Sequence, residues 1–150
     1  MTLLDFIIIA KHRTYAAGDS SADELLGDSG KIFNYAEEDY KYQDKYFGFN
    51  PFSGQEIIWQ QNKPLWTMNY YGQVFSDQVK AKEVYSFLRL ALLEVRVSRP
   101  FRGPEEFIKG DWKYVDVSQG DWENFSGQEE IYFKNQKVYQ LNYLGGILNK

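Results

Sequence analysis

Two segments of the chain repeat one another, and this internal repeat constrains the fold more than any other feature of the sequence. Sliding the chain by 73 positions aligns residues 52–72 with residues 125–145 without a gap, and 10 of these 21 positions are identical. Chance gives about one identity in a stretch of this length. Upstream, residues 39–44 match residues 111–116 at an offset of 72. The sequence therefore predicts two related structural units.

Each copy contains three segments that are rich in aromatic and β-branched residues and are separated by glycine, asparagine and serine. This pattern is typical of consecutive antiparallel strands. Short polar turns at residues 60–64 and 134–137 predict a hairpin between the last two strands of each copy. The six predicted strands cover residues 40–46, 55–60, 65–73, 112–117, 128–133 and 137–144.

A helix is predicted before each group of strands. Ser76 can cap a segment with helical spacing of apolar residues, namely Val79, Val84, Phe87, Leu88, Ala91, Leu92 and Val95. Residues 3–10 share an apolar face, and although their β-branched run also fits a strand, the repeat favours a helix. A short third helix is predicted at residues 104–110, and residues 18–30 read as a polar loop.

The predicted fold class is α+β, with an internally duplicated α-β-β-β unit. The two units, at about residues 1–75 and 76–150, make up one domain of residues 1–150. We expect their strands to join as one curved antiparallel sheet or as two apposed sheets, packed against a central helix around residues 84–93.

Composition removes several classes of active site. The chain has no cysteine and one histidine, His12. Disulfides, thiolate-held metals, a cysteine nucleophile and multi-histidine metal sites are therefore excluded. A Ser–His–Asp arrangement would depend on His12 alone. We expect no metal and no cofactor.

The net charge is −4, and charges of both signs are spread along the chain without a basic block. Binding to a phosphate backbone depends on clustered basic residues, so nucleic acid is not an expected ligand. The N-terminal apolar run, residues 6–10, is too short for a signal peptide or a membrane span. We expect a soluble, cytoplasmic protein.

Four acidic residues occupy matching positions, namely Asp44 and Glu56 in the first copy and Asp116 and Glu129 in the second. Desolvation beside an aromatic face raises a carboxyl pKa, and paired carboxylates cleave glycosides. A hydrolase or lyase that uses Glu56 and Glu129, or an Asp–Glu pair within one half, is therefore the alternative hypothesis. We favour a structural role, in which each acid accepts hydrogen bonds from backbone amides or a tyrosine, because one asymmetric site does not need both copies.

Positions where the copies diverge are better candidates for binding, because the shared framework does not dictate them. The loops at residues 45–51 and 117–124 diverge, and their aromatic rings either line a ligand cleft or cap the open end of the core. Arg102 has no strict counterpart and either holds an anionic ligand or forms a surface salt bridge. The candidate ligand-binding residues are Tyr42, Tyr46, Phe49, Arg102, Tyr114 and Trp122.

The leading hypothesis is a non-catalytic module that binds a small molecule or a protein partner through an aromatic cleft between the two units. Flat rings supply a large contact area at a low entropy cost. Few residue types suited to catalysis are present. A monomer and a homodimer both fit the sequence.

Several separated motifs carry a family resemblance: YQDKYFG at residues 42–48, FSGQE at 52–56, MNYYG at 68–72, PFRGP at 100–104 and GDW at 120–122. They resemble the bacterial family called domain of unknown function 5680, over nearly the whole chain. The resemblance implies an uncharacterised domain, which some relatives carry behind a helix-turn-helix as a sensor or effector module.

This chain departs from that family pattern in two places. We find no segment for a helix-turn-helix, so the arrangement that implies regulation does not carry over. Tyr143 and Leu144 stand before the paired glycines, where the family pattern has a histidine, so no role of that histidine carries over either.

Overall fold

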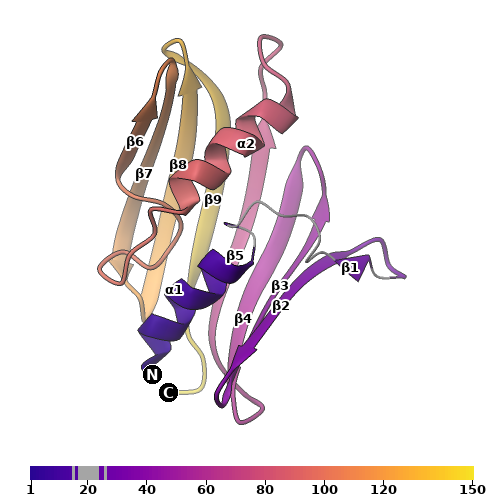
Figure 1. The fold of residues 1–150 in the computed structure, drawn as a ribbon, viewed down its shortest axis with the longest axis vertical. Helices are drawn as coiled ribbons and strands as arrows, with labels where there is room; N and C mark the ends of the chain where they lie inside the picture. Colours follow the sequence, from indigo (N-terminus) through magenta and orange to yellow (C-terminus); the bar gives the residue numbers. More distant parts are fainter. Residues whose placement is uncertain (15, 17–23, 26) are drawn as a thin grey trace.

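The computed structural model describes residues 1–14, 16, 24, 25 and 27–150, and these form one nine-stranded antiparallel sheet with two helices (Figure 1). The elements are α1 (Leu3–Arg13), β1 (Glu24–Leu25), β2 (Lys31–Glu37), β3 (Tyr40–Gly48), β4 (Phe52–Gln60), β5 (Lys63–Val74), α2 (Ala81–Leu92), β6 (Glu106–Lys109), β7 (Trp112–Asp121), β8 (Asn124–Phe133) and β9 (Gln136–Ile147). The strand order is β1-β2-β3-β4-β5-β9-β8-β7-β6, so β5 and β9 meet at the centre. The α+β class with an antiparallel sheet is confirmed.

Both long helices lie where the sequence predicts them. At the start of α1, the Thr2 side chain accepts from the Asp5 amide and the Asp5 carboxylate accepts from the Thr2 amide, which forms a capping box. The apolar stripe of α2 is buried. However, α2 begins after Lys80 rather than at Ser76, because the Glu83 carboxylate accepts from the Lys80 amide and closes the first turn there.

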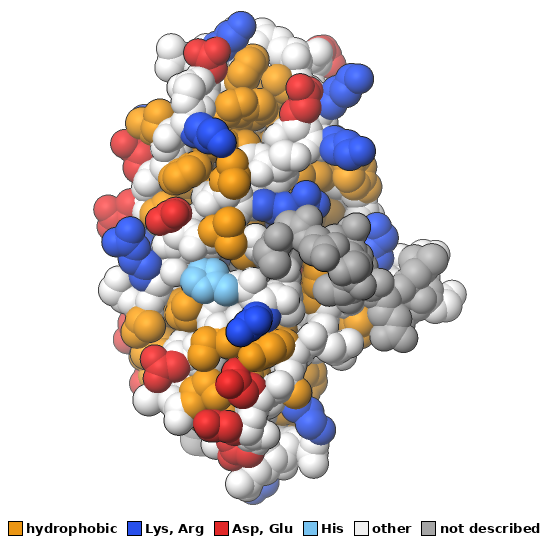
Figure 2. Space-filling model, in the orientation of Figure 1, with side chains coloured by type: hydrophobic (Ala, Val, Ile, Leu, Met, Phe, Trp, Pro, Cys, Tyr) orange, Lys and Arg blue, Asp and Glu red, His pale blue; other side chains and the backbone are white. Residues whose placement is uncertain are grey.

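Figure 1 shows α1 and α2 on the same side of the sheet, so two helices, and not one central helix, cover it. We call the covered side the inner face and the opposite side the outer face. Figure 2, which views the molecule from the helix side, shows acidic and basic side chains interspersed and not gathered by sign. No helix in the described part of the chain is long and apolar enough to cross a membrane.

The two predicted hairpins are confirmed. Gln61 and Asn62, between β4 and β5, have φ angles of 48° and 65°, and Lys134 and Asn135, between β8 and β9, have 49° and 65°. Positive φ at both central residues is the backbone geometry of a type I′ turn, whose twist matches that of the strands it joins. These turns fix the register between the paired strands, and the register determines which side chains lie on the inner face.

Three strands differ from the sequence-based expectation. β2 lies in a segment for which no strand was expected, and β6 replaces the helix predicted at residues 104–110. A helix limited to residues 104–110 is too short to be stable by itself, whereas β6 gains backbone pairing with β7 across a turn at Gly110, whose φ is 59°. In the predicted loop at residues 18–30, β1 forms a short strand; residues 18–23 and 26 lie outside the described residues.

Candidate functional site

A set of buried charged side chains lies on the inner face, and we call it the inner ionic network: Lys11, Asp44, Glu56, Arg102, Asp116 and Glu129. In the first half, Lys11 Nζ donates to both carboxylate oxygens of Glu56, at 2.8 and 2.9 Å, and to the Phe101 carbonyl oxygen at 2.8 Å. The Tyr42 hydroxyl also donates to Glu56. Burial lowers the pKa of Lys11, and the Glu56 carboxylate opposes that shift. Glu56 is therefore a buried member of an ion pair.

Glu129 has the corresponding environment in the second half. Arg102 donates to it with two nitrogens, Nη2 at 2.8 Å and Nε at 3.2 Å, and the hydroxyls of Tyr114 and Tyr139 donate at 2.6 and 2.7 Å. The surface salt bridge considered for Arg102 is wrong, because the residue is only 4 % exposed and its ion pair with Glu129 is buried. Its segment is held against the core by Phe101, whose ring centre lies 4.6 Å from that of Phe125.

The strand register places each aspartate directly opposite a glutamate: Asp44 opposite Glu56 and Asp116 opposite Glu129. The Tyr70 hydroxyl donates to Asp44 at 2.5 Å, and the Tyr143 hydroxyl donates to Asp116 at 2.9 Å. Burial, assisted by the charge of Glu56, raises the pKa of Asp44 to about 7.

Asp116 differs from Asp44 in forming a direct ion pair, with Arg99. Arg99 Nη1 donates to Asp116 Oδ2 at 2.8 Å. Burial and the charge of Glu129 raise the pKa of Asp116 to about 6, and the guanidinium of Arg99 opposes the rise. Both aspartates thus hold a proton more tightly than an exposed carboxyl does.

Glycines in the repeated FSGQE motif make room for the tyrosines that reach these aspartates. Gly54 pairs with Tyr70 across β4 and β5, and Gly127 pairs with Tyr143 across β8 and β9. A Cβ at either glycine would lie 2.2–2.3 Å from the opposing tyrosine hydroxyl oxygen. The glycine, the tyrosine and the carboxylate are therefore one packing unit that occurs in both halves.

We expect Gly127→Ala to lower the free energy of unfolding by about 1–3 kcal/mol, because the added methyl group displaces the buried ring of Tyr143. Urea denaturation measures the change. Gly27→Ala is the control, because a Cβ at this exposed glycine meets no atom within 4 Å. Equal stability of the two variants would contradict the packing role of Gly127.

The aromatic loop residues do not come together in one cleft. Phe49 is 60 % exposed and packs edge-on against Tyr85 of α2, with ring centres 5.3 Å apart. The Trp122 carbonyl oxygen instead accepts from the Trp66 indole at 3.0 Å. The loop containing Phe49 adjoins the end of β5, whereas Trp66 lies near its start, so Phe49 and Trp122 occupy opposite ends of the sheet. Tyr46 stacks on Phe33 in β2, with ring centres 6.1 Å apart.

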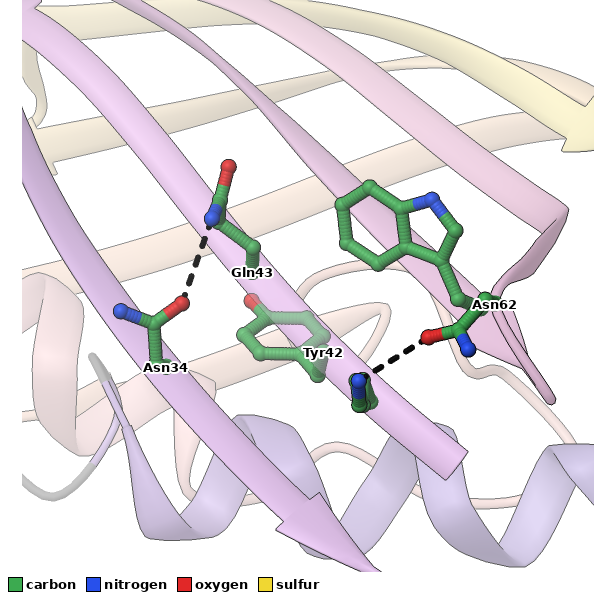
Figure 3. Close-up of a pocket in the computed structure, with 6 residues that line it drawn as sticks. Asn34, Tyr42, Gln43 and Asn62 are labelled. Atoms are coloured by element: carbon green, nitrogen blue, oxygen red, sulfur yellow. Dashed lines mark hydrogen bonds between the residues drawn. The ribbon is translucent and has the colours of Figure 1, made fainter. Parts of the chain in front are cut away.

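A pocket of about 300 Å³ opens on the first half of the sheet, and we call it the outer pocket. It is lined by Asn34, Lys41, Tyr42, Gln43, Trp59 and Asn62 (Figure 3). These residues come from β2, β3, β4 and the β4–β5 turn. Figure 3 shows Asn34 and Gln43 pointing toward one another, and Gln43 Nε2 donates to Asn34 Oδ1 at 3.3 Å. Lys41 Nζ donates to Asn62 Oδ1 at 3.0 Å.

Of the residues that line the outer pocket, sequence reasoning found Tyr42 and missed five: Asn34, Lys41, Gln43, Trp59 and Asn62. A signal was present in the repeat, because Gln43 aligns with Val115 and Trp59 aligns with Tyr132. Both are divergent positions within strands, whereas divergence was sought in loops. A register shift beside Trp59 further sets its direction, and this irregularity has no local sequence signature.

Among the described residues, no three His, Cys, Asp or Glu side chains are grouped so that they could hold a metal ion. The candidate carboxylates instead face cations and tyrosine hydroxyls, and their exposed fractions are 4 % for Asp44, 2 % for Asp116 and 0 % for Glu56 and Glu129. In this arrangement the acids accept hydrogen bonds within the protein.

Comparison with known proteins finds one family. The model of the family described as "Domain of unknown function (DUF5680)" matches residues 44–148, which is more than half of the chain. No curated protein and no solved structure matches the chain. The matched range contains Asp44, Glu56, Arg102, Asp116 and Glu129, which is most of the inner ionic network. The chain therefore belongs to this family of unknown function, as its separated motifs suggested.

Proposed function

We propose that the protein is a non-catalytic module that binds a small molecule in the outer pocket. The observation that carries this proposal is the chemistry of the pocket lining, which combines one indole with three side-chain amides. Small-molecule sites typically pair an aromatic surface with a few placed polar groups. The pocket lies within the first half, so this proposal replaces a cleft between the two halves.

A small molecule fits the outer pocket better than a protein partner does. The volume of the outer pocket, about 300 Å³, lies at the lower end of the range of small-molecule sites. No observation favours the carboxylate-based hydrolase or lyase, because a catalytic acid must reach the reacting atoms and Glu56 and Glu129 are both 0 % exposed.

Thermal-shift screening with metabolites, sugars and nucleotides tests this function. A ligand at 100 times its Kd stabilises the protein by about 2.7 kcal/mol, which for this size raises Tm by roughly 5–10 °C. We expect at least one compound to raise Tm of the wild type by several degrees and to lose this effect in Trp59→Ala.

The control is Tyr132→Ala, because Tyr132 lies opposite Lys113 just as Trp59 lies opposite Lys41. This variant should respond to the compound as the wild type does. A screen without any responding compound, or an equal response in Trp59→Ala, would contradict the proposed function.

We also propose that the chain is a single domain that arose by duplication, with units at about residues 1–75 and 76–150. Three correspondences support this proposal. The turns at Gln61 and Lys134 have nearly the same φ, the register shifts next to Trp59 and Tyr132 align, and each half has a glycine–tyrosine–aspartate contact. The two units would share one helix and four strands, not the three strands predicted, and β1 would be an additional strand of the first unit.

A further inference from the structure

We infer that the ligand of the outer pocket is a neutral saccharide. This inference rests on the proposed function and adds the chemical class of the ligand. Three properties of the lining carry it: an indole on a strand, paired amides beside it and, among the lining residues that the structure describes, no carboxylate.

The indole of Trp59 supplies the apolar part of such a site. Trp59 is half-buried, and its strand β4 lies beside β3, where Lys41 is its direct cross-strand neighbour. The axial C–H groups of a sugar ring form an apolar face that packs on a flat aromatic ring.

The amides supply the polar part. A sugar hydroxyl both donates and accepts, and an asparagine or glutamine side chain also does both. The bond from Gln43 to Asn34 uses one donor and one acceptor. It leaves the Gln43 oxygen and the Asn34 nitrogen as an adjacent acceptor and donor, because neither makes another hydrogen bond within the described part of the chain.

The charge of the lining favours a neutral ligand. Among the described lining residues Lys41 alone is charged, and its ammonium group already donates to Asn62. A cationic ligand would meet no carboxylate among these residues. A phosphorylated ligand would meet a single exposed lysine, whereas phosphate sites usually gather several donors.

The equivalent surface of the second half has a different chemistry. Val115 aligns with Gln43 and removes the amide, and Tyr132 aligns with Trp59. The Tyr132 hydroxyl donates to Glu130 at 2.6 Å, and Lys137 lies 3.2 Å from the same carboxylate. The lining that suits a saccharide is therefore found in the first half, and the equivalent surface of the second half serves as a control.

Two-dimensional NMR of the ¹⁵N-labelled full chain tests the inference. The probes are maltose, cellobiose, lactose and N,N′-diacetylchitobiose at millimolar concentration, with adenosine and uridine as planar competitors. We expect at least one disaccharide to shift the indole N–H signal of Trp59 and the side-chain amide signals of Asn34 or Gln43.

Two variants follow the same titration. Gln43→Val copies the residue that the second half carries at this position, so it suits the strand, and it should weaken the saccharide at least about tenfold. Tyr132→Ala should bind as the wild type does. Unchanged affinity in Gln43→Val would overturn the inference even if Trp59→Ala failed to fold.

The outcomes separate this inference from the function on which it rests. A shift of the Trp59 indole by adenosine, uridine or another metabolite, but by no disaccharide, would overturn the saccharide inference and leave the proposed function standing. If no compound shifts the indole N–H signal of Trp59, both the saccharide inference and the proposed function are overturned.

Discussion

Replacing Arg102 by methionine is expected to lower the free energy of unfolding by about 3–5 kcal/mol. The substitution keeps a long side chain but leaves the Glu129 carboxylate, which is 0 % exposed, without its bidentate guanidinium partner. Two tyrosine hydroxyls remain as donors to Glu129, and they do not neutralise its charge. A buried charge without a partner lowers the free energy of unfolding more than any other change expected in this network.

Urea denaturation of three variants separates this effect from a general loss of contacts. Lys113→Met removes an exposed ion pair of 3.3 Å with Glu106 and should cost less than about 1 kcal/mol. The double variant Arg102→Met/Glu129→Gln removes both charges and should recover much of the loss. If the double variant were as unstable as Arg102→Met, the burial of an unpaired charge would not be the cause.

Arg102 also connects the two halves of the sheet. Its guanidinium carbon lies 5.5 Å from the centre of the Tyr70 ring in β5, while its ion pair is with Glu129 in β8. The neighbouring Phe101 carbonyl accepts from Lys11 of α1. The segment after α2 therefore contacts the ion pair of Glu56 through Phe101 and forms the ion pair of Glu129 through Arg102. This link between the two halves is a structural reason for burying these charges together.

Six of the strands, β3, β4, β5, β7, β8 and β9, were predictable because their sequence pattern is local. Ile58 and Ile131 mark the buried face of β4 and β8, and both are 0 % exposed. The polar turns that contain Asn62 and Asn135 predict the hairpins, because asparagine tolerates positive φ. A hydrophobic period of two and a turn of two residues can both be recognised within a short stretch of sequence.

The partners of the acids were not predictable in the same way. Lys11 lies 45 residues from Glu56, and Arg102 lies 27 residues from Glu129. No local pattern pairs a helix lysine with a strand glutamate at such a distance. The tyrosine donors were foreseen in kind, because alternation places Tyr42 on the same face as Asp44. The outer pocket escaped detection because it depends on the side-by-side placement of three strands.

Stability is expected to fall as the pH rises from 5 to 8, by on the order of 4 kcal/mol in total. Asp44 and Asp116 have folded pKa values of about 7 and about 6, against an ordinary value of 3.8. At a pH between the ordinary pKa of 3.8 and the folded pKa, these two carboxyls have lost their protons in the unfolded chain and still hold them in the folded chain. A raised carboxyl pKa thus stabilises the folded state at low pH, and this stabilisation is lost as pH rises through the folded pKa.

Asp44→Asn should remove the larger share of this pH dependence, because an amide accepts from the Tyr70 hydroxyl and carries no charge to desolvate. The variant should match the wild type near pH 5 and exceed it at pH 8, when urea unfolding is measured at closely spaced pH values. Asp77→Asn, at an exposed position, should keep the wild-type profile. A wild-type stability that rises between pH 5 and 8, or an Asp44→Asn profile that still falls as steeply, would show that Asp44 does not hold its proton in the folded state.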